Sequence, residues 1–275
     1  MYPGYSVLMS VYKKESAEYL VAAVQSMLGQ TVPPSDFVLV CDGPLTAGLD
    51  QAVSSFESGY PGLFQVVRLE ENRGLAGALN EGLGRCRYGL VARMDSDDIA
   101  LPGRCRLQLG AFEKDPGLAL CSGDIAEFET EAGGVSCIRH VPRSHGEILT
   151  FARRRNPMNH MAVMYKKGAV EGAGGYVDVG LAEDYYLWVR MLQKGYRACN
   201  IGEVLVHARV GNGMHARRGG LGYVRGVLDL EGRMLGSGFI TRREYLGNCA
   251  VRVAGGLAPV WARKLLYGRV LRGRL

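Results

Sequence analysis

The sequence predicts an α/β fold with a Rossmann-like, mostly parallel central sheet flanked by helices. In the first hundred residues, apolar runs of strand length (5–12, 37–41, 64–69 and 89–94) alternate with segments whose apolar residues recur at helical spacing. Strands and helices that alternate in this order are typical of a doubly wound parallel sheet. The length of 275 residues fits one large domain, or one domain with an appendage.

Helix caps and chain breakers indicate where the elements begin and end. Ser16 is a suitable N-cap for a helix that Pro33-Pro34 ends, and Asp42-Gly43-Pro44 stops the second strand. Pro102 suits the first turn of a helix that runs to about residue 115. Farther along, the pattern predicts a strand at 118–123, a hairpin over 125–141, a strand at 160–166, a helix at 183–194, a strand at 203–210, a glycine- and arginine-rich loop at 211–222, and helices after it.

Composition and charge narrow the class of protein only in part. A hydrophobic content of 47% and a charged content of 22% are typical of a globular protein. The net charge of +6 fits a phosphate-bearing ligand, an anionic membrane surface or nucleic acid, and does not choose among them. Seven scattered cysteines without a C-x-x-C pair favour a reducing cytosol over a disulfide framework or a zinc site. We expect no signal peptide and no membrane span, because neither pattern occurs.

Polar residues follow three of the predicted strands. Tyr12, Asp42 and Asp95 each stand where an apolar run ends. Because ligands of doubly wound sheets bind beyond the carboxyl ends of the strands, we expect these three residues at one shared edge.

Three aspartates crowd the end of the fourth strand, in the stretch ARMDSDDIALPGR. Asp95, Asp97 and Asp98 would repel one another unless a cation lies among them. Hard divalent cations such as Mg²⁺ and Mn²⁺ prefer oxygen ligands, and one or two carboxylates often hold them together with substrate phosphates. The stretch therefore suits a metal–diphosphate complex. An ordinary turn, with one aspartate capping the helix near Pro102, explains the same residues.

The common phosphate-binding loops are missing from the sequence. Lys13-Lys14-Glu15-Ser16 follows the first strand in place of G-x-G-x-x-G, and no G-x-x-x-x-G-K-[ST] motif occurs. If the ligand is a nucleotide, a metal ion and arginines must therefore bind its phosphates.

An ordered set of segments resembles glycosyltransferase family 2, whose members have the GT-A fold. The family's order is preserved over roughly residues 5–222, in the segments SVLMSVYKKESAEYLVAAVQSMLGQT, FVLVCDGP, ENRGLAGALNEGL, ARMDSDDIALPGR, NPMNHMAVMYKKGAVEGAGGY, AEDYYLWVRML and RVGNGMHARRGG. The sequence departs from the family at Cys41, where an aspartate is usual. The late segments are most similar to bacterial hexosyltransferases that build O-antigen or exopolysaccharide repeat units. The resemblance implies a nucleotide-sugar-binding half at 1–98, an acceptor-binding half at 99–222 and a basic helical extension at 223–275.

The resemblance also implies which residues bind the donor, a UDP-sugar, and a Mn²⁺ or Mg²⁺ ion. Asp42 would accept a hydrogen bond from uracil, Asp95 would contact the ribose or the donor sugar, and Asp97 would ligate the metal with Asp98 close by. The other residues of the donor site would be Ser10, Val11, Tyr12 and Glu15 around the uridine, and Arg73 and Arg93 near the base or the diphosphate. Structural roles are the alternatives for three of them: Tyr12 covering the sheet edge, Asp42 shaping its turn, and Arg73 in solvent.

Two adjacent carboxylates begin the helix at 183–194. The resemblance favours Asp184 as the general base that deprotonates the acceptor hydroxyl, with Glu183 in a supporting or acceptor-orienting role. Carboxylates in a first turn also complement the helix dipole, which is a purely structural explanation. Direct attack on the anomeric carbon would invert it, so that an α-linked donor gives a β product.

The glycine-rich loop and one histidine are further candidates. Arg217 and Arg218 suit a mobile loop that closes over a diphosphate, and His215 is either an additional metal ligand or a solvated side chain. His160 either reaches the acceptor or is a hydrogen-bonded structural residue.

The C-terminal segment is basic, since no acidic residue follows Glu244. This charge suits binding to an anionic membrane surface, and a helix that packs on the domain explains the segment equally. The resemblance implies a peripheral protein on the cytoplasmic face of the inner membrane. Such a protein would transfer galactose or glucose from UDP to GlcNAc or GalNAc on undecaprenyl diphosphate, by a β-1,3 linkage. We expect no nucleic-acid partner, because the basic residues are not interleaved with regularly spaced aromatic residues.

Two other functional classes compete with this interpretation. A sugar-1-phosphate nucleotidyltransferase also uses a nucleotide-binding sheet and Mg²⁺, but residues 12–15 lack the glycine-rich, arginine-containing loop that follows the first strand in such enzymes. A non-catalytic nucleotide-sugar-binding protein is favoured only by the basic tail, whereas Asp97 and Asp184 favour catalysis.

Overall fold

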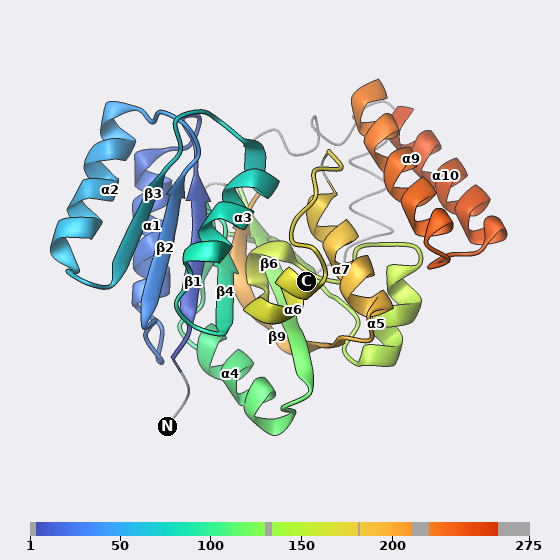
Figure 1. Ribbon diagram of the computed structural model, residues 1–275, viewed down its shortest axis with the longest axis horizontal. Helices are drawn as coiled ribbons and strands as arrows, with labels where there is room; N and C mark the ends of the chain where they lie inside the picture. Colours follow the sequence, from blue (N-terminus) through green and yellow to red (C-terminus); the bar gives the residue numbers. More distant parts are fainter. Residues whose placement is uncertain (1–3, 130–133, 181, 211–219, 258–275) are drawn as a thin grey trace.

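One mixed sheet forms the centre of the molecule, with helices on both of its faces (Figure 1). The computed structural model describes residues 4–129, 134–180, 182–210 and 220–257. Within them the sheet has nine strands. These are β1 (Ser6–Val11), β2 (Asp36–Cys41), β3 (Phe64–Arg68), β4 (Leu90–Met94), β5 (Ile99–Ala100), β6 (Leu118–Phe128), β7 (Val135–Arg139), β8 (Met164–Lys166) and β9 (Arg197–Arg209).

The strands follow one another across the sheet in the order β3-β2-β1-β4-β8-β6-β9-β5, and β7 pairs with β6 outside this row. The pairs β1–β2, β2–β3 and β1–β4 are parallel, as the alternation of strands and helices predicts. β8 is antiparallel to both of its neighbours, β4 and β6. Because β6 therefore runs in the same direction as β4, its carboxyl end lies at the same edge of the sheet as those of β1, β2 and β4.

Both faces of the parallel strands are buried, which explains their nearly continuous apolar runs. In β1, Leu8 belongs to one hydrophobic cluster, whereas Val7 and Met9 belong to a second cluster on the other face. Helices α1 (Ala17–Leu28), α2 (Ala47–Gly59) and α4 (Arg104–Lys114) cover the second cluster. The first cluster is covered by α3 (Gly74–Arg85), α5 (His145–Ala152), α6 (Lys167–Gly172), α7 (Glu183–Gln193) and α9 (Leu221–Gly236).

The early strands and the helix after Ser16 are confirmed, but the cap differs in detail. Ser16 is the N-cap of α1 without a capping hydrogen bond from its side chain, and its backbone N–H donates to Glu15 Oε1 at 2.8 Å. No helix is predicted between the second and third strands, yet α2 lies there. Its signal is present in the sequence: Thr46 accepts a hydrogen bond from the backbone of Leu49 at 3.4 Å and caps an amphipathic helix.

Several predicted boundaries differ from the structure. Pro102 precedes α4, whose N-cap is Gly103. The predicted strand at 160–166 begins as a 3₁₀ turn, η1 (His160–Ala162), before β8. The predicted strand at 203–210 starts earlier, at Arg197, because β9 pairs in parallel along the whole of β6. The hairpin over 125–141 is confirmed as the β6–β7 pair, and α9 starts inside the predicted 211–222 loop.

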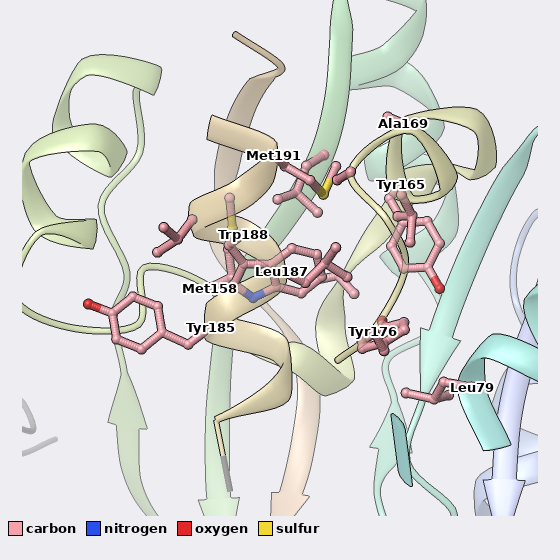
Figure 2. Packing of buried hydrophobic residues seen from close by; sticks show 14 of the residues in the cluster. Leu79, Met158, Tyr165, Ala169, Tyr176, Tyr185, Leu187, Trp188 and Met191 are labelled. Atoms are coloured by element: carbon pink, nitrogen blue, oxygen red, sulfur yellow. The ribbon is translucent and has the colours of Figure 1, made fainter. Parts of the chain in front are cut away.

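The C-terminal part that the structure describes is a helical pair, α9 and α10 (Arg242–Leu257). The two helices pack side by side at the end of the molecule opposite β3 and α2 (Figure 1). Leu230 and Met234 of α9 share a hydrophobic cluster with Trp188 of α7. Figure 2 shows Trp188 reaching from α7 into this cluster beside Met158. Among the described residues, no helix is long and apolar enough to cross a bilayer.

Candidate active site

The carboxyl ends of β1, β2 and β4 form the candidate site, as the sequence predicts. These strands are neighbours in the sheet and run in the same direction. Tyr12, Asp42 and Asp95 follow their last residues. Ser10 is half-buried, Val11 is buried and Tyr12 keeps 37% of its surface exposed, so the end of β1 offers an aromatic side chain to a ligand.

Asp42 is buried and is held by its own chain. Its Oδ1 accepts from the backbone N–H of Arg73 at 2.7 Å, and its Oδ2 accepts from Asn72 Nδ2 at 2.9 Å. Gly43 follows with φ of +82°, and a Cβ there would lie 2.8 Å from the Asn72 nitrogen. The structural role considered for Asp42 is therefore real, and each oxygen keeps a second lone pair for a ligand.

Arg93 is a cation that pairs with one of the three aspartates. It lies on β4 with 1% of its surface exposed, and its Nη2 donates to Asp95 Oδ1 at 2.5 Å. Its Nε and Nη1 have no hydrogen-bond partner in the described part of the chain. Burial opposes the charge of Arg93, but the carboxylate of Asp95 keeps its pKa above the usual value.

Asp95, Asp97 and Asp98 offer oxygen atoms that all lie within 4.8 Å of one another. Burial, followed by the charges of Asp95 and Glu15, raises the pKa of Asp97 to about 7. Burial and the charge of Asp97 also raise the pKa of Asp98 well above its usual range. This negative cluster of hard oxygen ligands fits Mg²⁺ or Mn²⁺, because a divalent cation would relieve the repulsion that shifts both groups.

Arg209, which the sequence reasoning did not identify, braces this cluster. Its backbone N–H donates to Asp98 Oδ1 at 2.7 Å, and its Nε donates to the Asp97 carbonyl at 3.2 Å. The guanidinium lies 3.8 Å from the ring centroid of Tyr19 and 4.5 Å from that of Phe128. Asp98 therefore binds the end of β9, and it does not cap α4. No local signal marks Arg209, because the contact joins residues more than a hundred positions apart.

The two carboxylates of α7 lie near Arg93 but differ in their contacts. Asp184 Oδ2 accepts from Asn156 Nδ2 at 2.6 Å. Burial raises the pKa of Asp184, whereas Asn156 and Arg93 act against that rise. Glu183 has a buried Oε2 without a partner among the described residues, and burial together with the charge of Asp184 raises its pKa to about 7. The raised pKa values make both carboxylates stronger proton acceptors than ordinary carboxylates, as a general base requires.

Comparison with known proteins identifies the family. The sequence pattern of the family described as glycosyl transferase family 2 matches residues 6–168, more than half of the chain. The chain belongs to this family. An uncharacterized glycosyltransferase of Haemophilus influenzae is 40% identical over 268 residues, which are 98% of this chain and 99% of the relative. The amylovoran biosynthesis glycosyltransferase AmsE of Erwinia amylovora is 36% identical over 272 residues, 98% and 100% of the two chains.

A third relative of this glycosyltransferase has a more specific name. It is the UDP-Gal:alpha-D-GlcNAc-diphosphoundecaprenol beta-1,3-galactosyltransferase of Escherichia coli, 34% identical over 270 residues, 98% of this chain and 97% of the relative. Solved structures show the same fold. The mannosyltransferase PcManGT from Pyrobaculum calidifontis, in complex with GDP-Man and Mn²⁺, has a TM-score of 0.66 at 19% identity, over 100% of this chain and 77% of its own. S. aureus TarS 1-349, in complex with UDP-GlcNAc, has a TM-score of 0.68 at 16% identity. The match covers 98% of this chain and 76% of the TarS chain. The glycosyltransferase therefore has the GT-A fold.

Other predicted site residues of the glycosyltransferase are placed less centrally. Arg73 contributes its backbone to Asp42, while its side chain is half exposed and lies 3.9 Å from Glu81. His160 is buried and shares a 3.0 Å hydrogen bond with the Tyr176 hydroxyl. Burial and then Arg93 lower the pKa of His160 well below its usual range, which supports the structural role considered for it. Arg217, Arg218 and His215 lie outside the described residues.

A second buried arginine of the glycosyltransferase, Arg104, was also missed. Its Nη2 donates to the backbone carbonyls of Arg93 at 2.6 Å and Val163 at 3.1 Å, and its Nε donates to Gln108 at 3.2 Å. These contacts fasten the end of β4 to the segment between η1 and β8. Arg104 thereby fixes the strand that carries Arg93 and Asp95. In sequence it looks like an ordinary charged residue of a helix.

Proposed function

We propose that the protein is a metal-dependent, inverting UDP-sugar hexosyltransferase. It moves galactose or glucose to GlcNAc or GalNAc on undecaprenyl diphosphate, by a β-1,3 linkage, in O-antigen or exopolysaccharide synthesis. One observation carries the proposal: buried Arg93 donates to Asp95 of the aspartate cluster and also interacts electrostatically with Asp184 of α7, which supports a donor site and a base at one centre. The name of the 34% identical galactosyltransferase supports the choice of donor and acceptor.

The donor side of the site is proposed to bind the nucleotide and a metal ion. Asp97, with Asp98 close by, would hold Mn²⁺ or Mg²⁺, which when bound would stabilise negative charge on the departing diphosphate, and Asp95 would contact the ribose or the donor sugar. Ser10, Val11 and Tyr12 would contact the uridine. Asp42 would accept a hydrogen bond from uracil. The remaining residues of the donor site would be Glu15, Arg73, Arg93, Arg217 and Arg218. His215 would be a further metal ligand.

The chemical step is proposed to use the carboxylate of Asp184. It accepts the proton of the acceptor hydroxyl while the hydroxyl oxygen forms a bond to the anomeric carbon of the donor. The bond from that carbon to the UDP oxygen breaks at the same time, and UDP leaves with the electron pair. Attack from the face opposite UDP inverts the anomeric carbon. Glu183, next to the base, would orient the acceptor.

The test is transfer by the purified protein. UDP-galactose, UDP-glucose and other UDP-sugars are incubated with Mn²⁺ or Mg²⁺ and a synthetic GlcNAc-diphosphate-lipid analogue. We expect UDP release, a product one hexose heavier, and a β-1,3 linkage by NMR; the Asp184→Asn variant should lose the activity. The absence of transfer from every donor contradicts the proposal. Release of pyrophosphate from UTP and a sugar 1-phosphate would instead indicate a nucleotidyltransferase.

The proposed place of action is the cytoplasmic face of the inner membrane. A lipid-linked acceptor is found there, and the basic C-terminal part of the sequence suits an anionic surface. Residues 258–275, which carry most of this charge, lie outside the described residues. Sedimentation of the protein with phosphatidylglycerol vesicles, but not with neutral vesicles, is the expected result.

A further inference from the structure

Two cysteines face each other on neighbouring strands of the sheet. Cys121 of β6 and Cys199 of β9 are partners in the parallel register of these strands, and their sulfur atoms lie 3.7 Å apart. Cys121 is fully buried, whereas Cys199 is half-buried. The two thiols therefore form one pair, with a buried member and a member that a small reagent can reach.

The hydrogen bond between the two thiols makes them chemically different. It lowers the pKa of Cys199 and, together with burial, raises the pKa of Cys121 well above its usual range. The thiolate is the form of cysteine that attacks an oxidant, so Cys199 is the member that reacts first. The sulfur of Cys121 then lies beside the product of that reaction.

A disulfide at this position requires a local movement of the strands. Neighbouring strands lie about 4.8 Å apart, which is within the range of Cα separations that a disulfide tolerates. The Cβ atoms of directly paired residues are about as far apart, whereas a disulfide brings them to about 3.8 Å. Closing the bond therefore draws β6 and β9 together. The register of β6 shifts between Leu118 and Leu120, just before Cys121, and this irregular stretch can absorb part of the movement.

The sheet joins Cys121 to the candidate active site. Cys121 pairs with Met164 of β8, and Met164 pairs with Ala92 of β4, the residue before Arg93. One row of directly paired residues thus runs from Cys199 across the sheet to the neighbour of Arg93. A movement of β6 at Cys121 acts on this row.

A buried hydrogen-bond network joins the same two places. Gln108 Nε2 donates to the carbonyl of Cys121 at 3.0 Å and to that of Ala162 at 2.8 Å. Gln108 Oε1 accepts from Arg104 Nε at 3.2 Å, and Arg104 Nη2 donates to the Arg93 carbonyl at 2.6 Å. Gln108 and Arg104 are fully buried, so water does not replace a bond that is lost between them. A shift of the Cys121 carbonyl therefore disturbs the support of the strand that carries Arg93.

We propose that Cys121 and Cys199 are a redox-modification site, at which a hydroperoxide produces a reversible disulfide that weakens sugar transfer. Cys199 reduces the hydroperoxide, takes up one of its oxygen atoms as a sulfenic acid, and releases an alcohol, or water where the oxidant is hydrogen peroxide. The sulfur of Cys121 then bonds to the sulfur of Cys199, and the hydroxyl group of the sulfenic acid leaves with the proton of Cys121 as water. Thiol reductants restore the two thiols. The effect on transfer rests on the proposed function, whereas the disulfide does not.

The test exposes the purified, reduced protein to hydrogen peroxide. Peptide mapping without reductant should show Cys121 joined to Cys199, with a mass lower by two hydrogen atoms, and dithiothreitol should reverse the change. Sugar transfer should fall about tenfold or more on oxidation, since a misplacement of about 1 Å in a site is enough for such a loss. Hydrogen exchange of residues 90–98 is a second readout that needs no substrate, and it should become about tenfold faster.

Two variants separate this pair from oxidation elsewhere. Cys199→Ser removes one sulfur, so it should keep its transfer activity and its exchange rates through the same treatment. Cys249→Ser removes a half-buried thiol from α10 and should respond to the oxidant as the wild type does.

Each outcome decides the inference. No disulfide in the wild type, or one between other cysteines, overturns it, as does the expected disulfide with unchanged transfer. A loss of transfer that persists in Cys199→Ser also overturns it, because oxidation elsewhere then causes the loss. If the wild type transfers nothing before oxidation, the proposed function fails, and the mapped disulfide together with the exchange of residues 90–98 decides the inference.

Discussion

The hydrogen bond between Asn156 and Asp184 gives a sharp prediction about pH dependence. Asp184 lies at the start of α7 with its Oδ2 held by Asn156 Nδ2 at 2.6 Å. Burial raises the pKa of Asp184, and the hydrogen bond from Asn156 is the largest contribution that acts to lower it. The variant Asn156→Ala removes that donor and leaves the carboxylate in place. The pKa of Asp184 should therefore rise further.

The size of the effect follows from the kind of bond that is lost. A hydrogen bond to a charged group contributes about 1.5–3 kcal/mol. One pH unit corresponds to about 1.4 kcal/mol. The acid limb, which is the fall of kcat/KM on the acid side of its pH profile, should therefore move to higher pH by about one to two units. A base must be unprotonated to act. Activity below the limb should thus fall roughly 10- to 100-fold, while activity above it is largely retained.

The assay is UDP release measured across pH with a saturating metal concentration. Asp184→Asn should abolish the limb together with the activity, and Gln51→Ala, which removes an exposed amide from α2, should leave the profile unchanged. An acid limb that stays in place, or moves to lower pH, in Asn156→Ala would refute the assignment of Asp184 as the base. A uniform loss of activity at every pH would indicate a purely structural role for Asn156.

Three further variants test the cluster and the fold. Asp97→Asn should weaken Mn²⁺-dependent binding of UDP by about tenfold or more in calorimetry, because a ligand oxygen loses its charge. Glu231→Gln should lower the free energy of unfolding by about 2–3 kcal/mol in urea, less than a fully buried pair, because Arg252 keeps 20% exposure. Gly82→Ala should cost about 1–3 kcal/mol, since a Cβ there collides with Leu8 and Val40.

The strands could be predicted because their signal is local. β1 and β2 are buried on both faces, so most of their residues are apolar and the run stands out. The length of β9 could not be predicted in the same way, because it depends on pairing with β6, some eighty residues earlier. The antiparallel insertion of β8 is likewise set by tertiary contacts with β4 and β6. Local patterns predict which segments form strands and helices, whereas tertiary packing decides which strands pair in the sheet.

The residues of the site likewise divide into those that a local pattern predicts and those that only tertiary contacts bring in. Asp95, Asp97 and Asp98 are adjacent in sequence, so their crowding could be seen and a cation required. The residues that support them come from elsewhere: Arg209 arrives from the end of β9, and Arg104 holds β4 from within α4. Contacts of this kind produce no regular residue spacing that could be recognised in the sequence. Resemblance to a family supplies roles, but it does not supply these partners.

The charge balance around Arg93 explains how the cluster can fold and still favour a metal ion. The charges of Asp95 and Glu15 act on Asp97, those of Asp97 and Asp95 act on Asp98, and the buried cation Arg93 pairs directly with Asp95. Arg93 acts to lower the pKa of Asp97, but burial, followed by the charges of Asp95 and Glu15, still raises that pKa to about 7. The remaining negative charge favours a divalent cation over a monovalent one. Replacing Arg93 with methionine should therefore lower the stability of the metal-free protein more than that of the Mn²⁺-loaded protein, and thermal unfolding with and without Mn²⁺ measures that difference.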